Sequence, residues 1–364
     1  MSIQPRGPLL NPNLTRPDWQ ATISRANDAL WLDKNENLDS KLLEVSQNIL
    51  KDLAPVSLAS YPNCGELYRK IAKWLNVTPD SLILTPGSDG AIRLTFEAFV
   101  NEGNAVVHTL PTFAMYSVYS QMFGVNAQPV VYKRGLKGPE LSVDDILSHL
   151  TKIKPKLFCL PNPDSPTGTV LPSEALKKIV IHCLDINTLV LIDEAYHPFY
   201  DVTCVPWIRE YRNLIVARTF SKAWGLAGLR IGYAVGHPDT IKFLHKLRPM
   251  YEVSTISIAF MERMLDFKDE MYRSVRRLND GKAYFSKQMQ NLGFGVLPSE
   301  GNFLHIAFGE YANIVHQSLK DKVLYRADFK EPCLKGYSRF STTSIDTFEP
   351  IVKIIQKSIT GDQV

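Results

Sequence analysis

The sequence predicts an α/β protein, in which a mostly parallel β-sheet is flanked by helices and followed by a smaller α+β domain. Short apolar runs rich in β-branched residues occur through the middle of the chain, helical patterns lie between several of them, and the pattern changes after about residue 250. Strand–helix alternation is typical of a largely parallel sheet that helices cover on both faces. We therefore expect a large domain over residues 40–250, and a smaller domain formed by residues 251–364 together with residues 1–39.

Six short runs are expected to be buried strands, because they are apolar and most of them are bounded by polar or turn residues. They cover residues 81–85, 105–109, 156–160, 188–192, 213–217 and 230–235. Shorter strand-like pieces, such as residues 303–308, are expected in the smaller domain. Ligands of open parallel sheets bind beyond the carboxyl ends of the strands, so the residues that follow these runs are the first candidates for a site.

Helices are expected where apolar side chains recur with the spacing of one helix face. Residues 173–184 have this pattern, and Ser173 is expected to be the N-cap of that helix. A similar apolar stripe covers residues 67–75, and another helix is expected from Asp89 to Phe99. In the smaller domain, one long helical stretch is expected from Ile256 to about Asn291.

The composition is that of a globular chain and argues against several other classes of protein. Of the 364 residues, 45% are hydrophobic and 21% are charged, so a disordered or fibrous protein is not expected. The net charge of +4 is small and the apolar runs are short, so we expect neither a nucleic-acid nor a membrane partner. The N-terminus lacks the apolar core of a secretory signal. Cysteines in odd number and without a C-x-x-C pair predict reduced thiols in the cytoplasm and no metal site. They are Cys64, Cys159, Cys183, Cys204 and Cys333.

The most informative segment is residues 218–233, which directly follows one of the expected strands. It reads Arg-Thr-Phe-Ser-Lys-Ala-Trp-Gly-Leu-Ala-Gly-Leu-Arg-Ile-Gly-Tyr. The hydroxyls of Thr219 and Ser221 and the guanidinium of Arg230 suit phosphate oxygens, and the glycines let backbone approach a ligand. Lys222 can form a Schiff base with an aldehyde beside such a site, whereas an isolated lysine in a glycine-rich loop is usually only solvated.

This segment resembles the lysine motif S-K-x-x-x-x-[AG]-G-L-R-x-G of fold-type I pyridoxal-phosphate enzymes, with its nearest relatives in the histidinol-phosphate aminotransferase branch of the class I/II aminotransferases. Other segments resemble further motifs of this family, in the family's order. They are residues 34–37 (N-E-N), 61–62 (R-Y-P), 87–92 (G-[AS]-D-x-x-I), 111–116 (P-T-[YF]-x-M-Y), 162–168 (N-P-N-N-P-T-G), 193–196 (D-E-A-Y) and 339–341 (R-[IV]-[ST]). The resemblance covers most of the chain and implies the fold-type I architecture, the cofactor pyridoxal 5'-phosphate and an amino-transfer reaction.

The resemblance also implies roles for individual residues. Lys222 would hold the cofactor as an imine and then move a proton between the substrate Cα and the cofactor. Asp193 would keep the pyridine nitrogen protonated, Tyr196 would donate to the phenolic oxygen, and Phe113 would stack on the ring. The cofactor phosphate would lie at the start of a helix, where the helix dipole favours an anion. Its expected contacts are Gly87, Ser88, Asp89, Thr219, Ser221 and Arg230.

Substrate and partner contacts follow from the same resemblance. Arg339 would grip an acidic group of the substrate with a bidentate fork, and Arg326 is a second candidate for a substrate phosphate or acid. Tyr61 resembles a residue that reaches the cofactor phosphate of the partner subunit, which implies a homodimer with a shared active site. Ser165 stands where the family has an asparagine that bonds the phenolic oxygen, and Asp164 precedes it. Because serine is shorter, it would need a water molecule to reach the ring.

Three functions remain open on the sequence. The first is an aminotransferase that moves an amino group between an amino acid or amino phosphate, such as histidinol phosphate, and a 2-oxo acid. The second is a decarboxylase of the threonine-phosphate type, since the bond that stands perpendicular to the ring decides the outcome. The third is a binding domain without chemistry, against which the presence of Lys222, Asp193 and Arg230 together argues. A nicotinamide dehydrogenase is not expected, because the glycines after Lys222 lack G-x-G-x-x-G spacing.

Overall fold

The computed structural model of the protein describes residues 4–14, 25 and 28–360. Its centre is an eight-stranded sheet with the order β2-β11-β10-β9-β8-β3-β4, in which β5 also pairs with β3. The strands are β2 (Leu82–Thr85), β3 (Ala105–Leu110), β4 (Asn126–Ala127), β5 (Val130–Val131), β8 (Leu157–Pro161), β9 (Leu189–Asp193), β10 (Leu214–Thr219) and β11 (Gly232–Gly236).

The sheet is mixed but mostly parallel, which confirms the predicted fold class. Strands β3, β8, β9 and β10 run parallel to one another, whereas β11 is antiparallel to both β10 and β2. All six expected strands are present, with bounds that differ from the prediction by one or two residues. Apolar β-branched residues fill these strands because both faces of the sheet are covered.

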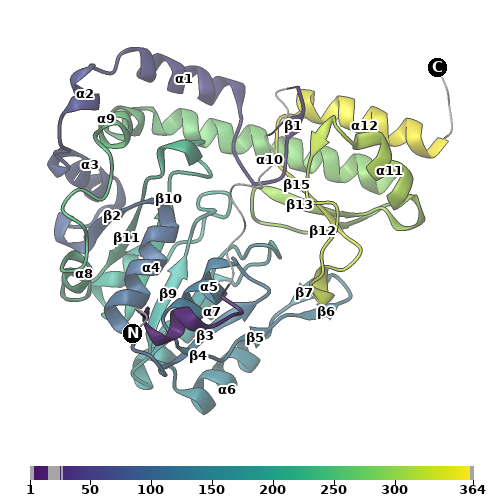
Figure 1. The fold of residues 1–364 in the computed structure, drawn as a ribbon. Helices are drawn as coiled ribbons and strands as arrows, with labels where there is room; N and C mark the ends of the chain where they lie inside the picture. The colour runs from purple at the N-terminus through teal and green to yellow at the C-terminus, as the bar shows by residue number, and fades with distance from the viewer. Residues whose placement is uncertain (1–3, 15–24, 26–27, 361–364) are drawn as a thin grey trace.

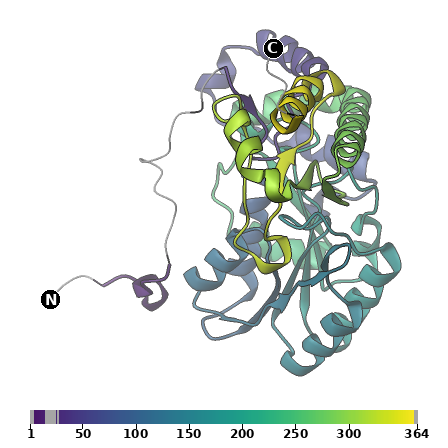
Figure 2. The ribbon, with the colours of Figure 1, turned by 90° about the vertical axis from the view of Figure 1, so that its right-hand side faces the viewer.

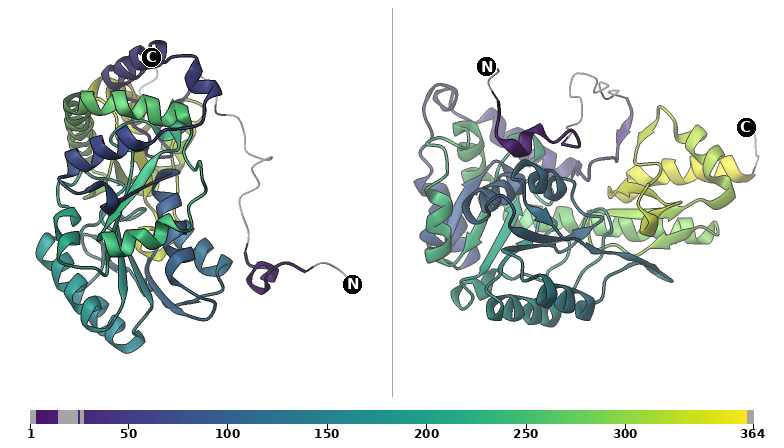
Figure 3. Two further views of the ribbon diagram at one scale, coloured as in Figure 1. Left: turned by 90° about the vertical axis from the view of Figure 1, so that its left-hand side faces the viewer. Right: turned by 60° about the horizontal axis from the view of Figure 1, so that its bottom comes forward.

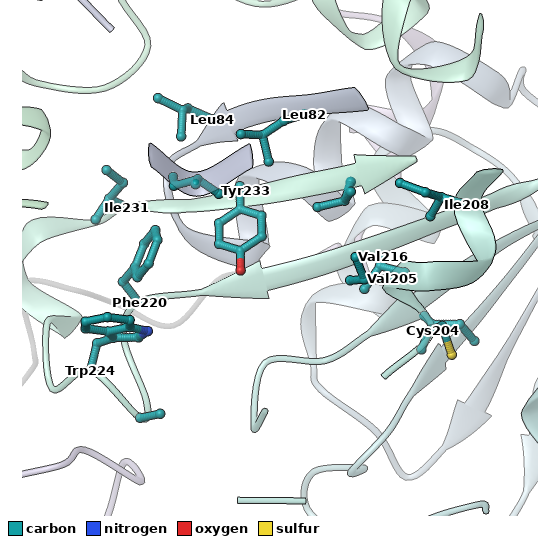
Figure 4. Close-up of a cluster of buried hydrophobic side chains, with 14 of the residues drawn as sticks. Leu82, Leu84, Cys204, Val205, Ile208, Val216, Phe220, Trp224, Ile231 and Tyr233 are labelled. Atoms are coloured by element: carbon teal, nitrogen blue, oxygen red, sulfur yellow. The ribbon is translucent and has the colours of Figure 1, made fainter. Parts of the chain in front are cut away.

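Helices cover both faces of the sheet and form two large apolar clusters with it (Figure 1). One face packs against α4 (Gly87–Phe99), α5 (Met115–Met122) and α8 (Pro238–His245). The other packs against α3 (Gly65–Leu75), α6 (Val143–Ile153) and α7 (Ser173–Asp185). Figure 4 shows part of the second cluster, where Val216 and Tyr233 of the sheet lie among side chains such as Phe220.

Two local predictions about helices were wrong. Ser173 is the first residue of α7 and not its N-cap, because Pro172 before it has the extended backbone of a cap residue and makes no side-chain cap bond. The long stretch expected from Ile256 is divided into α9 (Thr255–Met264) and α10 (Lys268–Asn291) by a 3-10 turn. The helices expected at residues 67–75 and 89–99 are present as α3 and α4.

The C-terminal part of the chain forms its own layer at one end of the sheet (Figures 1 and 2). An antiparallel sheet of order β12-β13-β15 packs with three helices around a separate apolar cluster. The strands are β12 (Gly295–Leu297), β13 (Phe303–Ala307) and β15 (Ser338–Ser341), and the remaining helices are α11 (Ala312–Leu319) and α12 (Ile345–Thr360). Side chains of α9 and of the first half of α10 belong to the apolar cluster that includes α3, α6 and α7, whereas the second half of α10 belongs to the C-terminal cluster. Helix α10 therefore connects the large part of the molecule with the C-terminal part. The proposed domain bounds at residues 40 and 251 stay a prediction.

The N-terminal segment contacts both parts of the molecule. Strand β1 (Leu30–Trp31) pairs in parallel with β14 (Val323–Leu324), and α1 (Ser40–Lys51) packs against α9 and α10. The short 3-10 helix η1 (Gly7–Leu10) lies against α5 of the large part (Figure 3, right). None of the helices in the described ranges has both the length and the apolar character of a membrane span.

Candidate functional site

A cavity of about 520 Å³ lies at the carboxyl ends of the central strands. Its floor is formed by residues that end or follow β3, β8, β9 and β10, and its walls come from the N-terminal segment and the C-terminal part. All the predicted site residues line it except Gly87 and Tyr61. They are Ser88, Asp89, Phe113, Ser165, Asp193, Tyr196, Thr219, Ser221, Lys222, Arg230, Arg326 and Arg339.

Lys222 follows β10 and directs its amine into this cavity. Its Nζ donates a hydrogen bond to the carbonyl of Lys34 at 2.7 Å and lies 5.7 Å from the centre of the Tyr196 ring. Burial lowers the pKa of the Lys222 amine below its usual range. A lowered pKa increases the neutral fraction of the amine, which is the form that attacks a carbonyl or accepts a proton.

Asp193 is the last residue of β9 and is 5% exposed. Its carboxylate accepts hydrogen bonds from Tyr116 Oη at 3.1 Å and from the backbone N–H of Ala195 at 3.0 Å. Burial raises the pKa of Asp193 to about 6. A buried carboxylate without a cation beside it favours a positively charged N–H group at this end of the cavity.

Hydrogen-bond donors suited to an anion lie together where the loop after β10 meets the start of α4. Arg230 Nη1 donates to Ser221 Oγ at 3.4 Å, and Thr219 Oγ1 donates to the same hydroxyl at 2.9 Å. No side chain caps α4, so its first N–H groups are available to a ligand. Gly87 does not line the cavity but lies directly behind it: a Cβ there would stand 3.0 Å from Arg230 Nη2, and its φ of +75° favours glycine.

Asn35 is a residue of the site to which the sequence analysis gave no role. Its Nδ2 donates to Tyr196 Oη at 2.9 Å, so the tyrosine's own proton points elsewhere. Its backbone N–H donates to Ser341 Oγ at 2.8 Å, and its carbonyl accepts from Asn302 Nδ2 at 2.9 Å. Asn35 has a left-handed backbone (φ 56°), which asparagine tolerates better than most residues. Its place in the motif at 34–37 was the available signal.

Ser165 lines the cavity, and Asp164 is fully buried behind it. The Asp164 carboxylate accepts hydrogen bonds from the hydroxyls of Thr109 at 3.0 Å, Thr112 at 3.3 Å and Thr167 at 2.9 Å. Burial raises the pKa of Asp164 to about 7. Asp164 therefore connects the end of β3 to the loop after β8, which fixes the wall that carries Ser165.

The C-terminal wall carries two arginines that differ in their partners. Arg339 is 9% exposed, and its Nη2 donates to the carbonyl of Asp33 at 2.9 Å. Arg326 forms an ion pair with Glu331, and the guanidinium lies 3.8 Å from the centre of the Phe329 ring. Arg326 and Arg339 exchange two backbone hydrogen bonds, so the two side chains start from adjacent positions.

Tyr61 lies outside the cavity of its own chain. Its side chain is 78% exposed and stacks on Tyr251, with 4.4 Å between the ring centres. The expected role of Tyr61 requires a partner subunit, so the position on the outer surface leaves that role a prediction.

Comparison with known proteins gives a consistent result. The family model for aminotransferase class I and II matches residues 27–355. The histidinol-phosphate aminotransferase of Thermoanaerobacter sp. (strain X514) is 33% identical over 326 residues, which cover 88% of this chain and 90% of the relative. The structure of histidinol-phosphate aminotransferase from Sinorhizobium meliloti in complex with pyridoxal-5'-phosphate has a TM-score of 0.77 at 23% identity, and covers 92% of this chain and 91% of that one. The structure of L-threonine-O-3-phosphate decarboxylase from Porphyromonas gingivalis has a TM-score of 0.75 at 20% identity, with 91% and 99% coverage. At these identities the two structures support the fold alone.

Proposed function

Because the chain belongs to the class I and II aminotransferases, which transfer amino groups with pyridoxal 5'-phosphate, we propose that Lys222 carries this cofactor in the cavity at the strand ends. The amino donor is an amino acid or an amino phosphate of the histidinol-phosphate kind, and the acceptor is a 2-oxo acid. The observation that carries this proposal is the convergence of Lys222, Asp193 and Arg230 on one cavity from separate segments of the chain.

The chemistry of the cavity fits the two ends of this cofactor. Arg230, Ser221 and the uncapped start of α4 are suited to a phosphate, and a Cβ at Gly87 would press on Arg230 Nη2 at 3.0 Å. At the other end, the buried carboxylate of Asp193 gains a cation when it meets a protonated pyridine nitrogen. Phe113 lines the cavity as an apolar surface for the ring.

The proposed roles follow from these positions. The bound cofactor supplies an electron-accepting ring that stabilises the negative charge developing at the substrate Cα. Asp193 keeps a proton on the ring nitrogen, and Tyr196, oriented by Asn35, donates its proton to the phenolic oxygen. Lys222 would take the proton from the substrate Cα and pass it to C4' of the cofactor, because its lowered pKa leaves the amine free to accept a proton.

Arg339 is the residue that we propose for the carboxylate of the 2-oxo acid. It is buried, and among the described residues its side chain has a backbone carbonyl as a partner but no carboxylate. A buried guanidinium without a counter-charge gains most from a bidentate carboxylate. Arg326 lies on the same wall and is the second candidate for an acidic group of the substrate.

The proposed assembly is a homodimer, in which Tyr61 completes the site of the partner subunit. Exposed apolar side chains lie near this residue in α2 (Val56–Ala59) and in the loop before α9, and a second copy of the chain is the proposed occupant. The patch consists of Val56, Leu58, Tyr61, Met250 and Tyr251, whose side chains are between 44% and 78% exposed. Patches of this kind mark protein interfaces. We further propose the cytoplasm as the location, because the five cysteines are free thiols.

The test is a spectrum of the cofactor-loaded protein, followed by a panel of amino donors. A donor that bleaches the visible absorbance and yields the matching 2-oxo acid supports an aminotransferase, whereas release of CO2 supports the decarboxylase alternative. Replacement Lys222→Ala is expected to reduce turnover by at least a thousandfold while the fold survives, since the proton carrier and the covalent anchor are lost together. Lys353→Ala, an exposed site on α12, serves as the matched control. Full turnover in Lys222→Ala would refute the proposal.

A further inference from the structure

The C-terminal wall of the cavity holds one arginine that forms an ion pair and one that, among the described residues, has no carboxylate within ion-pair distance. Nη2 of Arg326 lies 3.2 and 3.1 Å from the two carboxylate oxygens of Glu331, and both residues line the cavity. Arg339, on the adjacent strand, has no carboxylate partner within the described residues. A substrate in the cavity therefore meets one net positive charge on this wall and not two.

The pair of Arg326 and Glu331 is held in place by further contacts. Arg326 Nε donates to the carbonyl of Asp328 at 3.3 Å, and the guanidinium stacks on Phe329. The backbone of Arg326 is joined to that of Arg339 by hydrogen bonds of 2.8 and 3.1 Å. These contacts keep the Arg326 guanidinium next to Glu331, so a group that binds Arg326 there also lies near the Glu331 carboxylate.

Among the described residues, the N-terminal wall of the cavity carries two paired acids and one solvated lysine. Asp33 and Glu36 line this wall and are acidic, and Arg25 bridges them at 2.7 Å each. Lys34 also lines the cavity, but it is exposed, and a solvated ammonium on a flexible stem attracts carboxylate and phosphate alike. The difference between Arg326 and Arg339 is therefore the main charge feature of the cavity that can select among substrate side chains.

From this charge pattern we infer that Glu331 determines specificity, and that it directs the site towards 2-amino acids with an uncharged side chain and away from amino donors that carry a phosphate. A phosphate monoester carries nearly two negative charges at neutral pH, so its attraction to Arg326 is opposed by repulsion from Glu331. An amino acid with an uncharged side chain is neither attracted by Arg326 nor repelled by Glu331 through that side chain. Its α-carboxylate still binds Arg339. The inference rests on the proposed aminotransferase function and narrows its substrate class.

The experiment compares two amino donors in the holoenzyme and in the variant Glu331→Gln, which keeps the shape of the side chain and removes its charge. The donors are L-histidinol phosphate and the best of leucine, phenylalanine and methionine, and the rate of bleaching at low donor concentration gives kcat/KM of the half-reaction. We expect the wild-type enzyme to favour the uncharged amino acid by at least about tenfold. In Glu331→Gln this ratio should fall by about tenfold, because the repulsion is lost while Arg326 remains.

Two controls separate charge from shape. Glu331→Asp keeps the carboxylate and should keep the preference for the uncharged donor, whereas Glu310→Gln removes an exposed acid outside the cavity and should change neither rate. Inorganic phosphate should inhibit Glu331→Gln at about a tenfold lower concentration than it inhibits the wild type. The inference would be overturned by a wild-type enzyme that favours histidinol phosphate, or by an unchanged ratio of the two kcat/KM values in Glu331→Gln. Neither result would contradict the proposed aminotransferase function. Failure of every donor to bleach the enzyme would refute the proposed function, and the inference would fall with it.

Discussion

At the scale of single residues, two buried carboxylates lie at the ends of neighbouring strands and have different partners. Asp193 accepts from one tyrosine hydroxyl and one backbone N–H, which leaves it able to bind a cation in the cavity. Asp164 accepts from three threonine hydroxyls and does not line the cavity. Asp193 therefore faces the cavity, as its proposed role requires, whereas Asp164 joins the segments behind the cavity wall.

Asp164 predicts a dependence of stability on pH. Burial raises its pKa from 3.8 to about 7, so the folded protein binds more protons than the unfolded chain between these values. The stabilisation from the protonated form is complete below the unfolded pKa, and it is lost as the pH rises through the folded pKa. The loss is on the order of 4 kcal/mol in the free energy of unfolding.

Replacement Asp164→Asn should remove this contribution. Denaturation of the cofactor-free protein in urea at pH 5 and pH 8 measures this contribution. From pH 5 to pH 8, the free energy of unfolding of the wild type should fall by about 3 kcal/mol relative to that of the variant. Asp185→Asn, at an exposed position, should follow the wild type at both pH values. Parallel profiles for wild type and Asp164→Asn would show that the carboxyl group does not titrate in this range.

The sequence predicted the residues whose roles are encoded in local motifs, and it missed those that depend on contacts across the chain. Lys222, Asp193 and Arg230 each stand directly after a strand or in a glycine-rich segment, and all three line the cavity. Asn35 reaches Tyr196 across 161 positions, and no local pattern indicates such a hydrogen bond. The ion pair of Arg326 and Glu331 was missed although the two residues are only five apart, because an exposed arginine near a glutamate is common on any surface.

At the scale of elements, the start of α4 is the junction at which helix, sheet and Arg230 meet. Gly87 has a positive φ of 75°, and a side chain there would press on the Arg230 guanidinium at 3.0 Å. Gly103 also has a positive φ, of 81°, but a Cβ there meets nothing within 4 Å. Both glycines therefore need a positive φ, but only at Gly87 would a side chain touch Arg230.

This pair offers a matched test of the phosphate end of the cavity. Both Gly87→Ala and Gly103→Ala should lose about 1 kcal/mol or more of stability, because alanine is strained at positive φ. Only Gly87→Ala should also weaken binding of pyridoxal 5'-phosphate, by about tenfold, since Arg230 must move. Equilibrium titration of the cofactor-free variants measures the dissociation constants, and equal constants for both variants would count against Arg230 as a phosphate ligand.

Element by element, the strands were predicted well and the helix boundaries less well. Short β-branched runs between turn residues leave few alternatives to a buried strand, so all six expected strands were found. The break between α9 and α10 was missed because the turn at Leu265–Phe267 contains neither glycine nor proline. Ser173 was assigned as a cap from its residue type, although Pro172 before it is the residue with the extended backbone.

At the scale of the whole molecule, the cavity is built from three parts of the chain, and a fourth contribution is expected from a second copy. The exposed apolar side chains around Tyr61 and Met250 are the surface that we propose for this contact. A charge at its centre should prevent association of two copies, because burying an unpaired carboxylate is costly.

Leu58→Glu tests this assembly. We expect the wild type to sediment as a dimer and the variant to sediment as a monomer with weakened cofactor binding, since Tyr61 of the partner subunit would be lost from the site. Leu136→Glu changes a fully exposed leucine on the hairpin between β6 (Lys133–Gly135) and β7 (Gly138–Glu140), and it should remain a dimer. A wild-type protein that sediments as a monomer at all concentrations would contradict the proposed assembly.

The pairing of β1 with β14 has a consequence for the order in which the protein matures on the ribosome. Leu30 is synthesised long before its partner Val323. The segment that carries Asn35 and the carbonyl acceptor of Lys222 therefore has no strand to pair with until β14 has been translated. A nascent chain can build the central sheet early, but it becomes competent to hold its cofactor only when β1 meets β14.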